Sequence, residues 1–152
     1  MKWWPIVGIT KKLTKNETYD SKIAVEPLKL FKKSFHLYMI DVGNSNQLNF
    51  ELYALHTPRY NIHRFGIYFS ASPRHADLLV VLGNPTPQMV EPLKETIRQM
   101  PEPFGILLIK GCDETGVDLE NLKLPNVVST MRGCPTASEI LAVLLKISGR
   151  TD

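Results

Sequence analysis

The stretch ADLLVVLG (76–83) decides the fold of this chain. From Leu78 onward it is a continuous apolar run that ends in a glycine, and Pro85 follows two residues later. A short run without polar alternation is typical of a strand that is buried on both faces of a sheet. The glycine and the proline are residues that end such a strand. We therefore predict a central strand over residues 76–82.

Further strands and helices are predicted on both sides of this run. Short apolar runs predict strands at 35–41, 65–70, 104–110 and 126–130. Leucine and isoleucine recur at helical spacing within 46–56, 87–99 and 137–147, which predicts three helices. Asn44 or Ser45 is expected to cap the first of them. Strands that alternate with helices indicate an α/β domain with a mostly parallel sheet of four or five strands.

Residues 1–33 are interpreted as an irregular N-terminal extension, and residues 34–152 as the folded domain. A proline and a glycine interrupt the apolar start of the extension, so no regular element is expected there. Adjacent tryptophans, Trp3 and Trp4, are unusual in a free tail, and aromatic side chains are typical of protein interfaces. We expect the extension to wrap around a partner subunit. Contact with a membrane surface is the alternative.

The composition excludes several classes of function. A length of 152 residues is enough for one domain with a sizeable core. A formal charge of +3 and the lack of long basic runs do not indicate nucleic-acid binding. No apolar stretch reaches the ~18 residues that span a bilayer, and the start does not resemble a signal peptide. We expect a cytoplasmic protein in which the two cysteines form no disulfide, because that compartment is reducing.

Cys112 and Cys134 follow two of the expected strands directly. Ligands bind α/β sheets beyond the carboxyl ends of the strands, so these cysteines are candidate metal ligands. Two buried thiols are the alternative interpretation, because free cysteine packs as a small apolar residue. The four histidines are scattered along the chain without metal-ligand spacing. The chain has no P-loop, no dinucleotide-binding glycine motif and no nucleophile elbow, so no catalytic residue is predicted.

Three segments carry a resemblance to a known family. They are PRYNIHRFGIYFSASPRHADLLVVLG (58–83), KGCDETG (110–116) and RGCPT (132–136). The chain resembles the small, cluster-carrying subunit of membrane-bound (group 4) NiFe hydrogenases and the homologous 20 kDa-type subunit of respiratory complex I (NADH:quinone oxidoreductase). The resemblance implies a flavodoxin-like three-layer fold. It also implies partners, namely a large hydrogenase-like or complex I-like subunit with ferredoxin-like and membrane subunits, and a peripheral position on the inner face of the cell membrane.

The resemblance implies a [4Fe–4S] cluster on four cysteines, and the chain departs from that pattern. Aligned on DVGNSNQLNFE (41–51), the first two cysteine positions hold Ser45 and Leu48. Cys112 and Cys134 match the third and the fourth. A serine oxygen is a harder ligand than a thiolate, and leucine cannot coordinate a metal. We therefore expect no standard cluster, with Leu48 filling its space and both cysteines lying close together as reduced thiols.

The segment SPRHAD (72–77) is the strongest match to the family. The resemblance implies that Arg74 and His75 lie near the cluster site. The alternative is that Arg74 pairs with the carboxylate of Asp41 or Asp77 and thereby ties a loop to a strand.

Three functions remain open, and in none of them is this subunit expected to be catalytic alone. The leading hypothesis is a divergent, structural small subunit of a hydrogenase-like or complex I-like oxidoreductase complex. The alternative is an electron-transfer subunit with an unusual iron–sulfur centre that uses Cys112 and Cys134. A further alternative is an independent flavin- or nucleotide-binding module, in which GNSNQ (43–47) would bind phosphate at a helix start.

Overall fold

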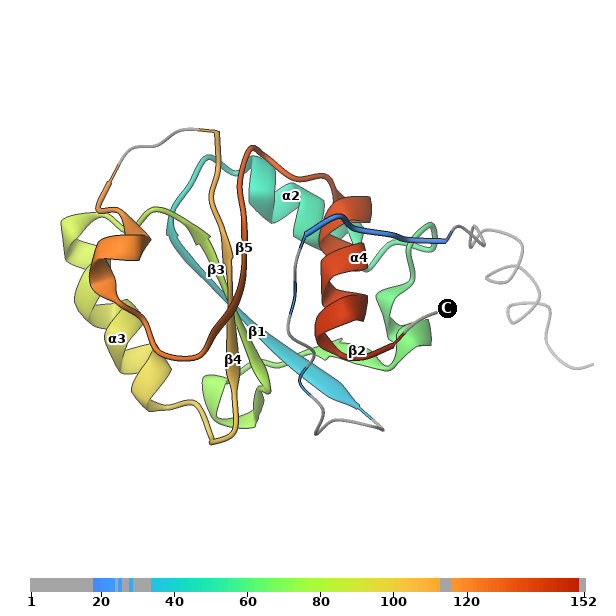
Figure 1. Ribbon diagram of the computed structural model, residues 1–152, viewed down its shortest axis with the longest axis horizontal. Helices are drawn as coiled ribbons and strands as arrows, with labels where there is room; N and C mark the ends of the chain where they lie inside the picture. Colours follow the sequence, from blue (N-terminus) through green and yellow to red (C-terminus); the bar gives the residue numbers. More distant parts are fainter. Residues whose placement is uncertain (1–17, 24, 26–27, 29–33, 113–115, 151–152) are drawn as a thin grey trace, which may run out of the picture.

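Five parallel strands form the centre of the protein (Figure 1). The computed structural model describes residues 18–23, 25, 28, 34–112 and 116–150. In chain order the strands are β1 (Phe35–Gly43), β2 (Ile67–Phe69), β3 (Leu78–Gly83), β4 (Gly105–Ile109) and β5 (Val127–Met131). The sheet order is β2-β1-β3-β4-β5, and every neighbouring pair is parallel. This order is that of flavodoxin-like sheets, so the predicted fold class is confirmed.

The helices cover the two faces of the sheet unequally (Figure 1). Helices α2 (Gln47–Ala54) and α4 (Ala137–Ile147) lie on one face, and α3 (Val90–Arg98) lies on the other. The remaining helical segments are the 3-10 turns η1 (Ile62–Phe65), η2 (Pro73–His75), η3 (Pro87–Met89) and η4 (Leu119–Leu122). The β2–β3 connection holds only η2, and the β4–β5 connection, where it is described, holds only η4. The face of α3 therefore has less helical cover than the face of α2 and α4.

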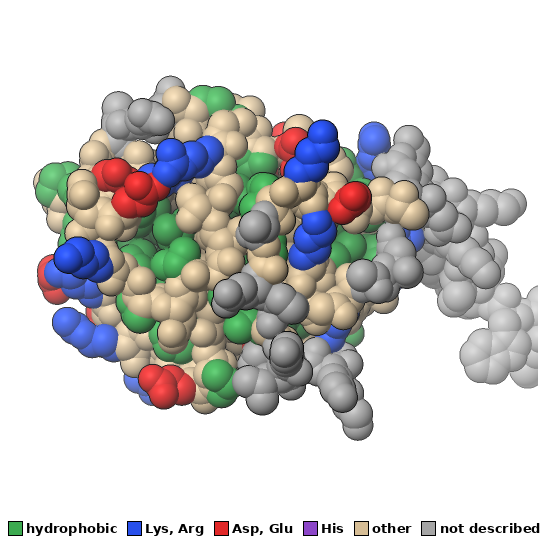
Figure 2. Space-filling view, in the orientation of Figure 1, with side chains coloured by type: hydrophobic (Ala, Val, Ile, Leu, Met, Phe, Trp, Pro, Cys, Tyr) green, Lys and Arg blue, Asp and Glu red, His purple; other side chains and the backbone are tan. Residues whose placement is uncertain are grey.

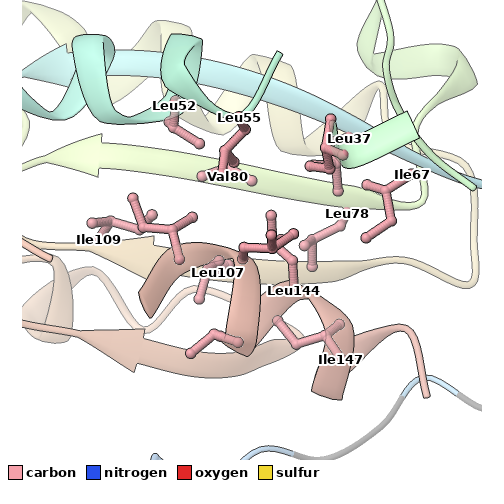
Figure 3. Close-up of a cluster of buried hydrophobic side chains, with 14 of the residues drawn as sticks. Leu37, Leu52, Leu55, Ile67, Leu78, Val80, Leu107, Ile109, Leu144 and Ile147 are labelled. Carbon is pink, nitrogen blue, oxygen red and sulfur yellow. The ribbon is translucent and has the colours of Figure 1, made fainter. Parts of the chain in front are cut away.

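Strand β3 joins the two apolar layers of the domain. All six of its residues are buried, as the apolar run in the sequence predicts. Leu78 and Val80 point into the layer under α2 and α4, and Leu79 and Val81 point into the layer under α3. In Figure 3, leucines of both helices meet leucines, isoleucines and Val80 of the strands in the first layer. Such two-sided burial is what a continuous apolar run makes possible.

The first helix begins within one residue of its predicted start, but its cap differs. Asn46 occupies the cap position of α2 and no side chain caps this helix end, so the prediction of a cap at Asn44 or Ser45 is wrong. The reason is local hydrogen bonding by Asp41. Its Oδ1 accepts hydrogen bonds from the amides of Gly43, at 3.1 Å, and Asn44, at 3.3 Å. These bonds form a turn after β1 before the helix can start.

The described part of the expected extension contacts the domain. Tyr19, Ile23, Val25 and Leu28 pack against the layer under α2 and α4. The amide of Leu28 donates to the carbonyl oxygen of Ile147 at 2.8 Å. Trp3 and Trp4 lie outside the described residues, so the prediction that they wrap a partner stays a prediction.

The described helices are all too short or too polar to cross a membrane.

Candidate functional site

Cys112 and Cys134 are neighbours because of the strand register. Ile109 and Met131 lie opposite each other at the ends of β4 and β5. Each cysteine follows its strand end by three residues, so the two Cα atoms come within 5.3 Å of each other. The structure joins them in a disulfide bond. The expected proximity of the two cysteines is therefore confirmed, and the expectation that both stay reduced is wrong, since equal offsets from paired strand ends place the sulfur atoms within bonding reach.

The residues before the two cysteines are also matched. Lys110 and Arg132 each come first in a Lys/Arg-Gly-Cys tripeptide, and both pair with the carboxylate of Glu120 on η4. The Nζ atom of Lys110 lies 3.3 Å from Glu120 and 2.7 Å from Asp118. One acidic turn therefore binds the cations of two neighbouring strands. On the face shown in Figure 2, basic and acidic side chains lie interspersed rather than in one patch of a single sign.

These ion pairs shift the pKa values of the residues that form them. The hydrogen bond from Lys110 to Asp118 is the largest cause that raises the lysine pKa above its usual value, and the bond to Glu120 adds to it. The same bond is the largest cause that lowers the pKa of Asp118. Lys110 is 9% exposed, so its ammonium group needs these acidic partners.

Backbone segments crowd together at the carboxyl ends of β1 and β3. A Cβ atom on Gly83, whose φ is +79°, would lie 2.4 Å from the carbonyl oxygen of Gly43. Next to it, Asn84 is 7% exposed, and its side-chain oxygen has no hydrogen-bond partner among the described residues. The side-chain oxygen and nitrogen of Asn44 also lack partners there. This edge of the sheet is thus closely packed and polar.

The two positions that lack cysteine lie in different environments. Ser45 is exposed just before α2, and Leu48 is 1% exposed within the layer under α2 and α4. Among the described residues, no three side chains of His, Cys, Asp or Glu are grouped so as to hold a metal ion. With Cys112 and Cys134 bonded to each other, the donor set does not fit a four-thiolate cluster that this chain would hold alone.

Arg74 and His75 lie exposed on η2. Ser72 caps this turn, with its hydroxyl oxygen accepting from the amide of Arg74 at 3.3 Å. Within the described part of the chain, Arg74 forms no ion pair with Asp41 or Asp77, so that alternative is wrong. Amides occupy both carboxylates instead: Asp77 Oδ2 accepts from a β1 backbone amide at 2.8 Å, and the two oxygens of Asp41 accept from a backbone amide and a side-chain amide.

A cavity of about 360 Å³ lies beside the loop that holds Cys134. Its wall is formed by residues 20–23 together with Met131, Arg132, Gly133, Pro135 and Glu139. The sequence does not reveal this cavity, because its two sides are more than a hundred residues apart in the chain. Only the packing of the N-terminal segment against α4 brings them together.

Histidines that look scattered in the sequence form a row of rings near β2. His56 lies 5.4 Å from His63, and Tyr68 lies 5.4 Å from His63 and 5.7 Å from His36, measured between ring centroids. Partial burial is the main cause that lowers the pKa of His56, and the nearby charge of His63 adds to it. Sequence reasoning missed this row because helical and strand contacts bring its members together.

Large apolar side chains are exposed on α2 and on the edge strand β2. Phe50 is 70% exposed, Tyr53 is 59% exposed and Tyr68 is 40% exposed. Tyr53 and His56 also line an apolar cavity of about 190 Å³ that reaches to Phe69 of β2. Aromatic side chains at such exposure are typical of protein interfaces.

Comparison with known proteins shows the family. No family model matches the chain. The chain is 31% identical over 121 residues to the probable membrane-bound hydrogenase subunit mbhJ of Pyrococcus furiosus, covering 74% of this chain and 72% of that protein. The chain belongs to the family of this hydrogenase subunit. The resemblance stated from the sequence is therefore confirmed.

Two further similarities extend the family to respiratory complexes. The chain is 36% identical over 101 residues to a subunit of the NADH-quinone oxidoreductase of Saccharopolyspora erythraea, covering 60% of this chain and 46% of that protein. Among solved structures, it is similar to a chain of the membrane-bound sulfane sulfur reductase, an archaeal respiratory membrane complex. That match has a TM-score of 0.56 and 25% identity, and it covers 78% of this chain and 70% of the other.

Proposed function

We propose that this protein is a divergent small subunit of a membrane-bound redox complex of the hydrogenase or complex I kind. Its relatives include a probable membrane-bound hydrogenase subunit and a subunit of NADH-quinone oxidoreductase. In this proposal its main role is structural: it binds partner subunits but carries no standard [4Fe–4S] cluster. It would lie at the membrane surface through a large hydrogenase-like subunit, ferredoxin-like subunits and membrane subunits.

The residues at the four cluster-ligand positions of the family support the proposed structural role. Two of the four positions hold Ser45, in solvent, and Leu48, inside the core. A cluster of this kind takes four thiolates, and the other two positions hold cysteines that are bonded to each other. When a cluster is bound at such a site it transfers single electrons, and this chain would offer it two thiols after reduction of the disulfide.

The exposed aromatic side chains of α2 support the partner-binding part. Phe50 and Tyr53 lie three residues apart on one helix, so they share a side of it. Their exposed surface is apolar at a place where nothing in the described chain covers it. We assign this surface to contact with a partner subunit of the complex, since hydrophobic anchors dominate the binding energy of protein interfaces.

Iron reconstitution tests the absence of a cluster. The reduced recombinant chain and the double variant Ser45→Cys, Leu48→Cys are incubated with iron and sulfide without oxygen. The proposal expects about four irons per chain in the variant and none held stoichiometrically in the parent. The matched control is Ser45→Cys, Leu52→Cys, because Leu52 is an equally buried leucine of α2 at a position without a ligand role. Equal uptake by parent and variant would favour an electron-transfer subunit with an unusual centre on Cys112 and Cys134.

Co-purification tests the partner surface. A tagged copy of the chain is isolated from membranes of its source organism, and its partners are identified by mass spectrometry. The double variant Phe50→Glu, Tyr53→Glu should lose those partners while its thermal unfolding stays close to that of the parent. Gln88→Glu is the control, because Gln88 is exposed on η3 at the other face of the sheet. Isolation of the tagged parent alone, from the soluble fraction, would contradict the proposal.

A further inference from the structure

We propose that Cys112 and Cys134 form a reversible dithiol–disulfide couple, which exchanges two electrons with a dithiol. This inference rests on the proposed lack of a cluster at these cysteines, and it goes beyond the structural role because it assigns them a chemistry of their own. The couple would sit at the carboxyl ends of β4 and β5, where α/β sheets place their ligands.

The register of the sheet sets the distance between the two cysteines. The separation of their Cα atoms, 5.3 Å, lies within the range of about 4.4–6.8 Å that disulfides require. It follows from the pairing of Ile109 with Met131 and from the equal number of residues after each. The positions of the cysteines are therefore a property of the sheet and do not depend on the bond between them.

Contacts around the cysteines hold this geometry when the bond is open. The amide of Lys110 donates to the carbonyl oxygen of Met131 at 2.8 Å. This hydrogen bond joins the segments that follow β4 and β5 just before each reaches its cysteine. Glu120 pairs with Lys110 and with Arg132, so one carboxylate links both loops. After reduction the thiols stay close, and their high effective concentration favours closing the bond again.

The environment of the pair suits exchange with an external thiol. Cys112 is exposed, so an incoming sulfur atom can reach it. Cys134 has a φ of +52°, in the left-handed region that favours glycine and asparagine. A side chain held in this unfavourable backbone conformation points to a functional constraint on its position.

The exchange balances in atoms and electrons. A thiolate of the incoming dithiol attacks the sulfur of Cys112, forms a mixed disulfide and releases Cys134 as a thiolate, which takes up a proton. The second thiol of the dithiol then attacks the mixed disulfide, closes its own disulfide and releases Cys112, which is protonated in turn. The cysteine pair gains two electrons and two protons, and the dithiol loses the same. The reverse reaction oxidises the pair with a disulfide.

A redox titration of the full chain tests the couple. The metal-free protein is equilibrated without oxygen in mixtures of reduced and oxidised dithiothreitol, quenched in acid, unfolded and alkylated with iodoacetamide. Intact mass spectrometry should show two species, with no adduct and with two adducts. Because two electrons move on each side, a tenfold change in the ratio of reduced to oxidised dithiothreitol should change the ratio of the two species tenfold.

Three variants sharpen the titration. Cys112→Ser and Cys134→Ser should each carry one adduct at every ratio. Glu120→Gln removes the carboxylate that links the loops. The ratio of reduced to oxidised dithiothreitol at which half of the chain is reduced should then fall about two- to fivefold, as expected for the loss of a partly exposed ion pair. An unchanged midpoint would overturn the role assigned to Glu120 in holding the pair.

Two results separate this inference from the proposed function. If the chain takes up no iron and still carries two adducts at the most oxidising ratio, its cysteines do not form a disulfide. That result would contradict the redox couple but not the proposed subunit without a cluster. Stoichiometric iron and sulfide on the parent chain, with both cysteines protected from alkylation, would overturn both.

Discussion

Glu51 connects two helices that are far apart in the sequence, and its removal should destabilise the domain. Its Oε2 atom accepts a hydrogen bond at 2.7 Å from the amide of Ala137, which is the first residue of α4. Ala137 is 1% exposed, so water does not readily replace this acceptor. The amides of a first helical turn have no partner within the helix. The carboxylate therefore satisfies a buried donor and also lies at the positive end of the helix dipole.

The loss can be calculated from these two contributions. A hydrogen bond to a charged group contributes about 1.5–3 kcal/mol to stability, and a charge at a helix end adds about 0.3–1 kcal/mol. Glu51→Ala should therefore lower the free energy of unfolding by roughly 2–4 kcal/mol. Glu51→Gln keeps an acceptor oxygen without the charge, so it should cost about 1 kcal/mol. Urea unfolding followed by circular dichroism measures both. With a slope of about 2 kcal/mol per molar, a loss of 2 kcal/mol moves the midpoint by about 1 M.

A surface glutamate provides the control for this experiment. Glu91 on α3 pairs with Lys94 at 3.0 Å, but its own side chain is largely exposed and that of Lys94 is half-exposed. Glu91 also lies in the first turn of its helix, so Glu91→Ala should lower the free energy of unfolding by no more than about 1 kcal/mol. If Glu51→Ala costs no more than this control, the connection between α2 and α4 does not carry the stability assigned to it, and the reasoning is refuted.

Three more predictions concern packing and pH. Gly83→Ala should be much more destabilising than Gly133→Ala in urea unfolding: both glycines have φ near +80°, but the new Cβ would meet the oxygen of Gly43 at 2.4 Å only in the first case. Leu144→Ala should cost about 3–5 kcal/mol in the same assay, because Leu144 is fully buried; a loss below about 1 kcal/mol would contradict its place in the core. Partial burial and a neighbouring histidine hold the pKa of His56 below its usual 6.5. The folded protein therefore binds this proton less readily than the unfolded chain, so the stability from a neutral His56 is present above pH 6.5 and is lost as the pH falls through the folded pKa. His56→Phe should flatten that part of the stability profile, and an unchanged profile would show that this histidine is not its source.

The strands could be located from the sequence because buried strands consist of short runs of apolar residues. The run at 76–82 is apolar at every position but Asp77, and β3 is buried at every position. The cap of α2 was predicted wrongly, because Asp41 forms a turn through its side chain that no apolar period reveals. The cavity beside the Cys134 loop could not be predicted, since its two sides come from distant parts of the chain. The row of histidine and tyrosine rings could not be predicted either, because its members follow no helical or strand period and only the fold places their rings next to one another.

The sequence by itself determined the family, the parallel sheet and the two positions at which cysteine is replaced, because these depend on residue identity and local period. The tertiary structure decided how the remaining cysteines relate to each other. Their positions after two predicted strands indicate that Cys112 and Cys134 lie at one edge of the sheet, but only the pairing of β4 with β5 brings them within bonding distance. The same holds for Glu120, which binds cations of two strands, and for Glu51, which serves a helix that begins far along the chain. Hydrogen bonds and ion pairs between distant residues exist only after the hydrophobic layers have brought the strands and helices together.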